Sequence, residues 1–160
     1  MVPYFCRANR GVDDMAVWLP VKFLNAAVSF GGSGSAAEAC IDAREPRRSS
    51  DTSVPRVTWW DHTGTTEWID RRFELPREVS SARVYWFDDT GFGGCRVPAS
   101  WRLLYKDCGE WKPVLASGKY GVCRDEWNDV SFVPVSTTSL RLEVSLQEKY
   151  SGGVLSWQLK

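Results

Sequence analysis

The residues best suited to chemistry lie in one stretch, Thr58 to Trp68, with the sequence TWWDHTGTTEW. It places two adjacent tryptophans, an aspartate and the only histidine of the chain directly before a strand-like run. Neighbouring side chains of a strand point to opposite faces, so Trp59 and Trp60 cannot both enter one core by simple alternation. One indole is then available as a flat binding surface beside polar groups. The alternative is structural: Trp59 closes the edge of the core and Trp60 packs against a second sheet.

The chain after Trp68 is a succession of short strands separated by turn signals, which is typical of an all-β sandwich or barrel. The clearest strand is SLRLEVSLQ, where leucine and valine alternate with polar residues from Leu140 to Gln147. A hairpin is expected to turn at Cys108-Gly109, because glycine supplies the positive φ that such turns often require. The predicted strands are EWIDRRF, ARVYWFD, SWRLLYKD, EWKPVLA, NDVSFVPV, SLRLEVSLQ and GVLSWQLK.

The beginning of the chain reads as two units. Residues 1–20 end in the strand-like MAVWLP, which has few neighbours in sequence to pair with, so we interpret them as the tail of an incomplete preceding β-sandwich. A second unit, residues 21–160, starts with FLNAAVSF as its first strand. The later segment REPRRSSDTSVPR is too long for a plain connector, so it is expected to be functional or packed down. The chain is accordingly expected to be a fragment of a longer protein.

Polar and aromatic loops are predicted to gather at one end of the sandwich. If consecutive strands are antiparallel, the segment before EWID and the loops at 88–99, 117–127 and 147–153 lie at the same end. A ring for the C–H face of a sugar, with charged groups for its hydroxyls, is what recognition of a neutral polyol requires. The candidates placed there are Trp59, Trp60, His62, Asp88, Asp89, Arg96, Tyr120 and Tyr150.

Composition argues against several classes of protein. With 20 acidic and 20 basic residues the net charge is zero, which gives no electrostatic case for binding nucleic acid or an acidic membrane. No apolar run reaches the roughly 20 residues that a membrane span needs. The first residues lack the layout of a signal peptide.

The cysteines offer no metal motif. The five cysteines include no C-x-x-C pair, and one histidine cannot complete a Cys/His zinc set. We expect mostly free thiols, which favours a reducing, cytoplasmic compartment.

Catalysis is not expected of this chain. A pair of His62 with a cysteine lacks a third group and an elbow motif. Asp88 and Asp89 resemble the two carboxylates of a glycosidase, but adjacent side chains diverge and cannot flank one bond. We expect one of them to cap its loop and the other to meet Arg96 or a ligand hydroxyl.

Several motifs together resemble a known family. TWWDHTGTTEW, VYWFDD, GGCRVPASWRLLYKD, EWKPV and GGVLSWQLK are similar to the C-terminal discoidin-like, galactose-binding-like β-sandwich of bacterial β-L-arabinofuranosidase-type glycoside hydrolases, family 127 and its relatives. The opening VPYFCRANRG resembles the end of the sandwich that precedes it there. The resemblance implies a jelly roll of about eight strands with a short N-terminal extension. It also implies a parent enzyme that removes arabinose-like sugars from plant glycans, whose catalytic barrel is not in this sequence.

Two details accompany the resemblance. Related sandwiches often hold a structural calcium, and Asp42 in ACIDAR is similar to the acidic residue that helps to bind it; the alternative is that Asp42 only caps a turn. Arg71 departs from the pattern, because an apolar or aromatic residue is expected there. Either its strand edge is exposed or Arg71 has a carboxylate partner, since an unpaired buried guanidinium is costly.

Two non-catalytic functions follow. In the first, the chain is a carbohydrate-binding accessory module, with the loop residues named above as its sugar site. In the second, it is a structural wing that packs on the catalytic domain of its parent, and the same aromatics anchor that interface. A sugar site would be a flat or concave aromatic patch with converging polar groups, whereas an interface would be a wider apolar surface. The surplus of polar groups favours sugar binding.

Overall fold

The computed structural model describes residues 25–31, 37, 40 and 45–160, so the tail inferred for residues 1–20 lies outside the described part. Its strands are β1 (Ala26–Val28), β2 (Val57–Thr58), β3 (Thr66–Phe87), β4 (Ser100–Asp107), β5 (Glu110–Pro113), β6 (Asn128–Ser145) and β7 (Gly153–Leu159). The strand pairs within the described residues are antiparallel. The predicted all-β galactose-binding-like sandwich is confirmed. Within the described ranges, no helix has the length and apolar character to cross a membrane.

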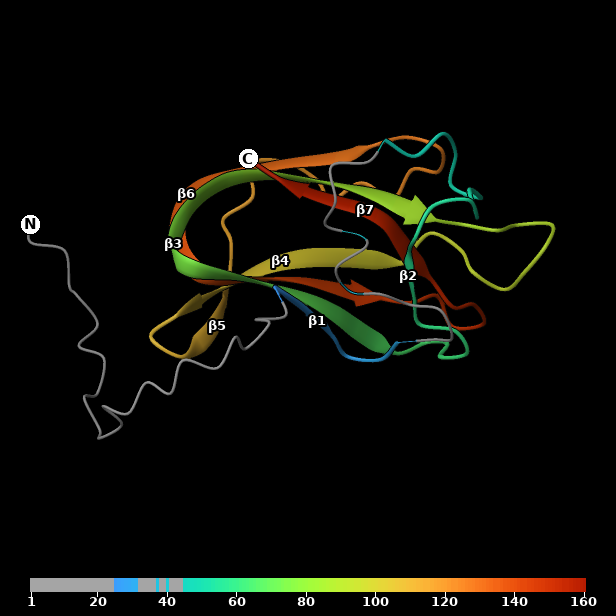
Figure 1. Cartoon of the computed structure of the whole chain (residues 1–160), viewed down its shortest axis with the longest axis horizontal. Coiled ribbons are helices and arrows are strands. Elements are labelled where there is room, and N and C mark those ends of the chain that lie inside the picture. Colours follow the sequence, from blue (N-terminus) through green and yellow to red (C-terminus); the bar gives the residue numbers. More distant parts are fainter. Residues whose placement is uncertain (1–24, 32–36, 38–39, 41–44) are drawn as a thin grey trace, which may run out of the picture.

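Two long strands join the layers of the sandwich. The hydrogen-bonded order is β2-β7-β3-β6-β4-β5, with β1 also paired to β3. The first half of β3 pairs with β1 and with the second half of β6, while its second half pairs with β7 and the first half of β6. Figure 1 shows β3 and β6 curving together at one side of the molecule, so that their halves face each other. We call this side the bent end.

The bend explains a difference from the sequence prediction. EWIDRRF and ARVYWFD, expected as separate strands, are the two halves of β3, and NDVSFVPV and SLRLEVSLQ are the halves of β6. The ladder between β3 and β6 shifts register between Arg72 and Arg77, a segment that contains Pro76. Proline has no N–H to donate, so the ladder is interrupted where the ribbon turns. The described part of the chain therefore holds seven strands, close to the expected number of about eight.

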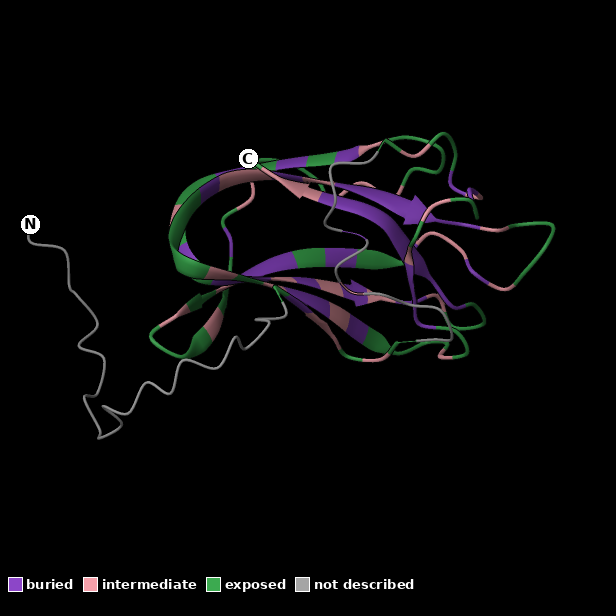
Figure 2. Ribbon diagram, viewed as in Figure 1, coloured by how far each residue is buried: buried purple, intermediate pink, exposed green. Residues whose placement is uncertain are grey.

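The core lies between the two layers. Leu140, Leu142 and Val144 of β6 are fully buried, whereas the alternating Arg141 and Glu143 point to the outer face. Figure 2 shows a similar alternation along much of β4, whereas β7 is buried along most of its length. Burial of each such side chain stabilises the fold by roughly 1.5–3 kcal/mol. The strict alternation predicted for this segment is confirmed.

The hairpin between β4 and β5 turns where the sequence predicted. Cys108 and Gly109 have φ values of 49° and 85°, and Asp107 pairs with Glu110 across them. Positive φ at both central residues matches the twist of the flanking strands. Among the described cysteines, Cys95 and Cys123 are free thiols, whereas Cys108 is disulfide-bonded, so the expectation of mostly free thiols does not extend to Cys108.

Arg71 is half-buried near the bent end. Its guanidinium carbon lies 6.0 Å from the ring centroid of Phe73, and no carboxylate of the described residues forms an ion pair with it. Burial, followed by the repulsion of Arg77, lowers the pKa of Arg71. Neither alternative expected for Arg71 is met in full, because the side chain is half-buried rather than exposed and contacts an aromatic ring rather than a carboxylate.

Candidate functional site

The predicted loops do meet at one end of the sandwich, opposite the bent end (Figure 1). Gly64 N–H donates to the carbonyl of Gln147 at 2.9 Å, and Arg96 N–H donates to the carbonyl of Ser151 at 2.9 Å. Asp88 N–H donates to the carbonyl of Ser49 at 2.9 Å. We call this region, formed by residues 59–65, 88–99, 117–127 and 146–152 with the approach at 45–56, the loop end. The continuous strands β3 and β6 each replace two predicted strands and the turn between them. Because both of these turns lie at the bent end, the predicted position of the loops at the opposite end is unchanged.

The two adjacent tryptophans differ in burial. Trp59 is completely buried, and its backbone N–H donates to the carbonyl of Gly152 at 3.0 Å. Trp60 is 53% exposed. The expectation that one indole is spare therefore holds for Trp60, whereas Trp59 belongs to the core and is removed from the candidate ligand-binding set.

Trp60 lines a shallow pocket of about 290 Å³. The pocket is open to solvent and combines an aromatic wall with the carboxylate of Asp89. Its lining residues are Arg56, Thr58, Trp60, Phe87, Asp89, Gly93, Gly94 and Cys95. This combination of a ring and a few polar groups in a concave surface is what small ligands such as sugars need.

Two glycines shape the pocket. A Cβ added at Gly94 would lie 2.2 Å from Cζ3 of Trp60, and one added at Gly93 would lie 2.1 Å from Oδ2 of Asp89. Any side chain at these positions would displace the indole or the carboxylate. The Gly93-Gly94 pair thus allows the loop backbone to pack closely against Trp60 and Asp89. The sequence alone does not predict this role.

Asp89 is held in place by its own loop. Its Oδ1 accepts a hydrogen bond from the backbone N–H of Cys95 at 2.8 Å and lies 3.7 Å from Nη1 of Arg96. Arg96 Nη1 also donates to the carbonyls of Gly93 and Cys95 at 2.9 and 2.7 Å. The guanidinium carbon of Arg96 lies 4.5 Å from the ring centroid of Tyr150, which is 39% exposed. Arg96 and Tyr150 therefore support the side of the pocket formed by Asp89.

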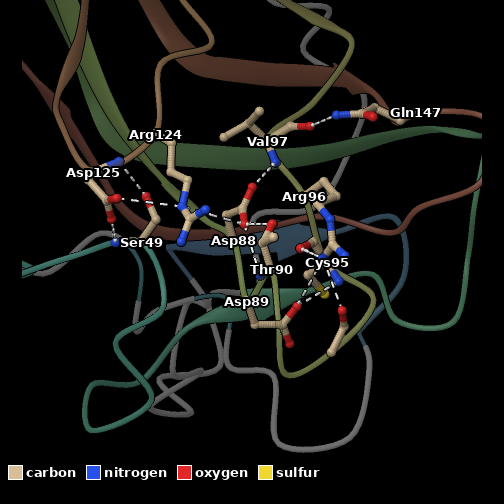
Figure 3. A network of polar contacts seen from close by, with 11 residues as sticks. Ser49, Asp88, Asp89, Thr90, Cys95, Arg96, Val97, Arg124, Asp125 and Gln147 are labelled. Atoms are coloured by element: carbon tan, nitrogen blue, oxygen red, sulfur yellow. Dashed lines mark hydrogen bonds and ion pairs between the residues drawn. The ribbon is translucent and has the colours of Figure 1, made fainter.

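Asp88 has a structural role. Its carboxylate, 3% exposed, accepts hydrogen bonds from the backbone and hydroxyl of Thr90 and from Val97 N–H at 3.0 Å. Arg124 Nε lies 3.7 Å from Asp88 Oδ1 (Figure 3). Burial raises the pKa of the Asp88 carboxyl, but these hydrogen bonds and the charge of Arg124 outweigh it, so the pKa is lowered. Asp88 caps the loop and Asp89 meets Arg96, as the sequence reading had proposed for the pair.

His62 belongs to a separate cluster. Its Nδ1 lies 2.6 Å from Oε1 of the buried Glu67, and its ring stacks on Phe30 with a centroid separation of 3.8 Å. Ser29 and Thr65 hydroxyls also donate to the Glu67 carboxylate. Burial raises the pKa of Glu67, but these bonds lower it by more. His62 does not line the pocket of Trp60, so the structure does not bring these two candidates into one site.

The remaining candidates lie elsewhere. Tyr120 packs its ring against Trp101 with centroids 4.7 Å apart, and so serves the core rather than the pocket. Asp42, proposed for calcium, lies outside the described residues. In the described part of the chain, no group of three or more His, Cys, Asp or Glu side chains is arranged to hold a metal ion.

Arg56 is the one charged residue of the pocket lining that is absent from the candidates predicted from the sequence. It ends the segment REPRRSSDTSVPR, whose unusual length had already indicated a packed or functional loop. Its guanidinium carbon lies 4.6 Å from the ring centroid of Phe87. Arg56 directly precedes β2, which pairs with β7, and no local motif indicates this position.

Solved structures share this fold. A chain of the Streptococcus pneumoniae beta-galactosidase BgaA aligns with a TM-score of 0.69 and 18% identity, over 89% of this chain and 94% of that one. The family 32 carbohydrate-binding module of C. perfringens NanJ, in complex with galactose, aligns with a TM-score of 0.61 and 14% identity, over 84% and 90%. Chitosan-binding module 1 from a Paenibacillus sp. chitosanase/glucanase gives 0.57 and 15%, over 84% and 92%.

These likenesses define the class of fold. The chain has the discoidin-like β-sandwich found in carbohydrate-binding modules of glycoside hydrolases. The sequence matches no protein-family model.

Proposed function

We propose that the chain is a non-catalytic carbohydrate-binding accessory module of a plant-glycan-degrading glycoside hydrolase, and that it binds sugar at the loop end. The observation that carries this proposal is the exposed indole of Trp60 in a pocket that also holds the Asp89 carboxylate. An indole face packs on the C–H face of a sugar, while a fixed carboxylate accepts hydrogen bonds from its hydroxyls. The galactose complex and the chitosan-binding module among the similar structures support this class of ligand.

The sugar and the parent enzyme are the finer part of the proposal. The resemblance to the β-L-arabinofuranosidase-type enzymes favours arabinose-like sugars and a catalytic domain of that type as partner. D-Galactose is the alternative monosaccharide. The calcium site proposed at Asp42 belongs to the same resemblance and stays a prediction, since its residues lie outside the described part.

Isothermal titration of the purified chain with L-arabinose, D-galactose and arabinan oligosaccharides tests the proposal. We expect binding to at least one of them, and a loss of about 10-fold or more in affinity in Trp60→Ala, because a central aromatic contact contributes more than about 1 kcal/mol to such a site. Trp111→Ala is the matched control, since Trp111 lies on β5 and does not line the pocket. Absence of binding to any of these sugars or to their acidic counterparts by the intact, folded chain would contradict the proposal.

A second candidate function is a structural wing that packs on a catalytic domain. It is favoured by a stack on the outer face, where the guanidinium carbon of Arg141 lies 4.2 Å from the ring centroid of Trp68 and 4.3 Å from that of Trp111. Tryptophan and arginine are enriched in the anchors of protein interfaces. This function becomes the preferred one if the folded chain binds none of the sugars.

A further inference from the structure

The pocket of Trp60 contains a guanidinium group, that of Arg56, that has no polar partner among the described residues. Arg56 makes a contact with the ring of Phe87, but it has no hydrogen-bond acceptor and no carboxylate partner among the described residues. Its Nε is buried without a partner. A guanidinium has five N–H donors, and leaving a buried donor unpaired is costly. A ligand acceptor that reaches this group would remove that cost.

The other charges of the pocket differ from Arg56 in this respect. Asp89 receives a hydrogen bond from Cys95 N–H and lies 3.7 Å from Arg96 Nη1, and Arg96 donates to two backbone carbonyls. Of the two charged side chains that line the pocket, Asp89 already lies beside Arg96, whereas Arg56 has no ion-pair partner among the described residues. The unpaired charge of the pocket is therefore positive and belongs to Arg56.

The position of Arg56 suits a ligand that also stacks on Trp60. Both residues line the same pocket of about 290 Å³, and Phe87 below Arg56 is buried. The guanidinium carbon lies 4.6 Å from the ring centroid of Phe87, a cation–π contact that restrains the guanidinium. A guanidinium held in one plane binds a carboxylate by two parallel hydrogen bonds.

We propose that the sugar bound in this pocket is acidic, a uronic acid, and that Arg56 is the residue that binds its carboxylate. The inference rests on the proposed sugar-binding function, and it replaces the neutral, arabinose-like sugar that the resemblance favours with an acidic sugar. Trp60 stacks on the pyranose ring, and Asp89 accepts a hydroxyl. Arg56 then distinguishes an acidic sugar from a neutral sugar of the same ring shape.

The experiment compares three ligands that share one ring: D-galacturonic acid, its methyl ester and D-galactose. Titration calorimetry of the intact chain is expected to give an affinity for D-galacturonic acid about 10-fold or more above that for the other two, because the hydrogen bonds are charge-assisted. The preference should weaken as salt is raised, since screening reduces the attraction of a partly exposed pair. Arg56→Gln should make the affinities for the acid and the ester equal.

Arg48→Gln is the matched control. It removes a positive charge from the same segment, but Arg48 is exposed and does not line the pocket, so the preference for the acid should persist. Circular dichroism checks that each variant is folded. Equal affinity for the acid and the ester in the unsubstituted chain, or a preference unchanged in Arg56→Gln, would overturn the inference and leave sugar binding intact. A folded chain that binds none of the three, and no arabinose ligand, would overturn the proposed function itself.

Discussion

Two neighbouring regions of the loop end contain similar residue types but have different roles. Around Asp88, donors and acceptors meet one another: the carboxylate is 3% exposed and accepts from Thr90 and Val97. Around Trp60, the indole is 53% exposed and the guanidinium of Arg56 has no polar partner among the described residues. The first region fixes the loops, and the second is left with groups that a ligand can satisfy. Residue type alone does not distinguish a structural region from a binding region. The difference is whether the polar groups already have hydrogen-bond partners within the protein.

Removal of the Asp88 carboxylate should have the largest effect on stability. Asp88→Ala leaves the N–H groups of Thr90 and Val97 without their acceptor, which costs about 2–4 kcal/mol in the free energy of unfolding. Urea unfolding measures this change. Asp129→Ala is the control, because Asp129 is exposed, and it should change the free energy by no more than about 0.5 kcal/mol. Equal effects of the two substitutions would remove the distinction between the regions.

Acid should weaken the Asp88 region with a defined sign. The folded-state pKa of Asp88 is lowered, so its contribution to stability is complete above the unfolded pKa of about 4 and is lost as pH falls from there through the folded value. The free energy of unfolding should therefore fall below about pH 4. Asp88→Asn carries no titrating carboxyl and should show a shallower fall. Parallel pH profiles for the two proteins would show that the lowered pKa of Asp88 does not contribute.

The smallest effect on stability is expected in the pocket. Gly94→Ala places a Cβ within 2.2 Å of Cζ3 of Trp60, and the exposed ring can move away, so the free energy of unfolding should change by less than about 1 kcal/mol. Sugar affinity should nevertheless decrease, because the stacking surface is displaced. Gly118→Ala is the control, since its added Cβ meets no atom within 4 Å. A large loss of stability in Gly94→Ala would mean that the Trp60 region is also structural.

The sequence predicted those features that depend on local pattern. The alternation around Leu142 gave the inner face of β6, and glycine at 109 gave the hairpin turn. Counting antiparallel strands placed the loops at one end. The continuity of β3 was missed because Pro76 and its neighbours read as a break, whereas the pairing with β6 holds both halves in one strand.

The site itself was predicted only in part. Trp60, Asp89, Arg96 and Tyr150 do lie together, because their loops share one end. Trp59 and Asp88 could not be separated from their more accessible neighbours by residue type, since burial depends on contacts between distant segments. Arg56 reaches the pocket only through the pairing of β2 with β7, which no local signal encodes.

The bent ribbon also restricts how the molecule can move. Because β3 and β6 each run through both layers, the layers cannot slide past one another without breaking the ladder between these strands. The distances among the loops are therefore fixed before any ligand arrives. A binding surface built on such a frame loses little conformational entropy when it is occupied, so the free energy of its contacts goes into affinity rather than into ordering the loops.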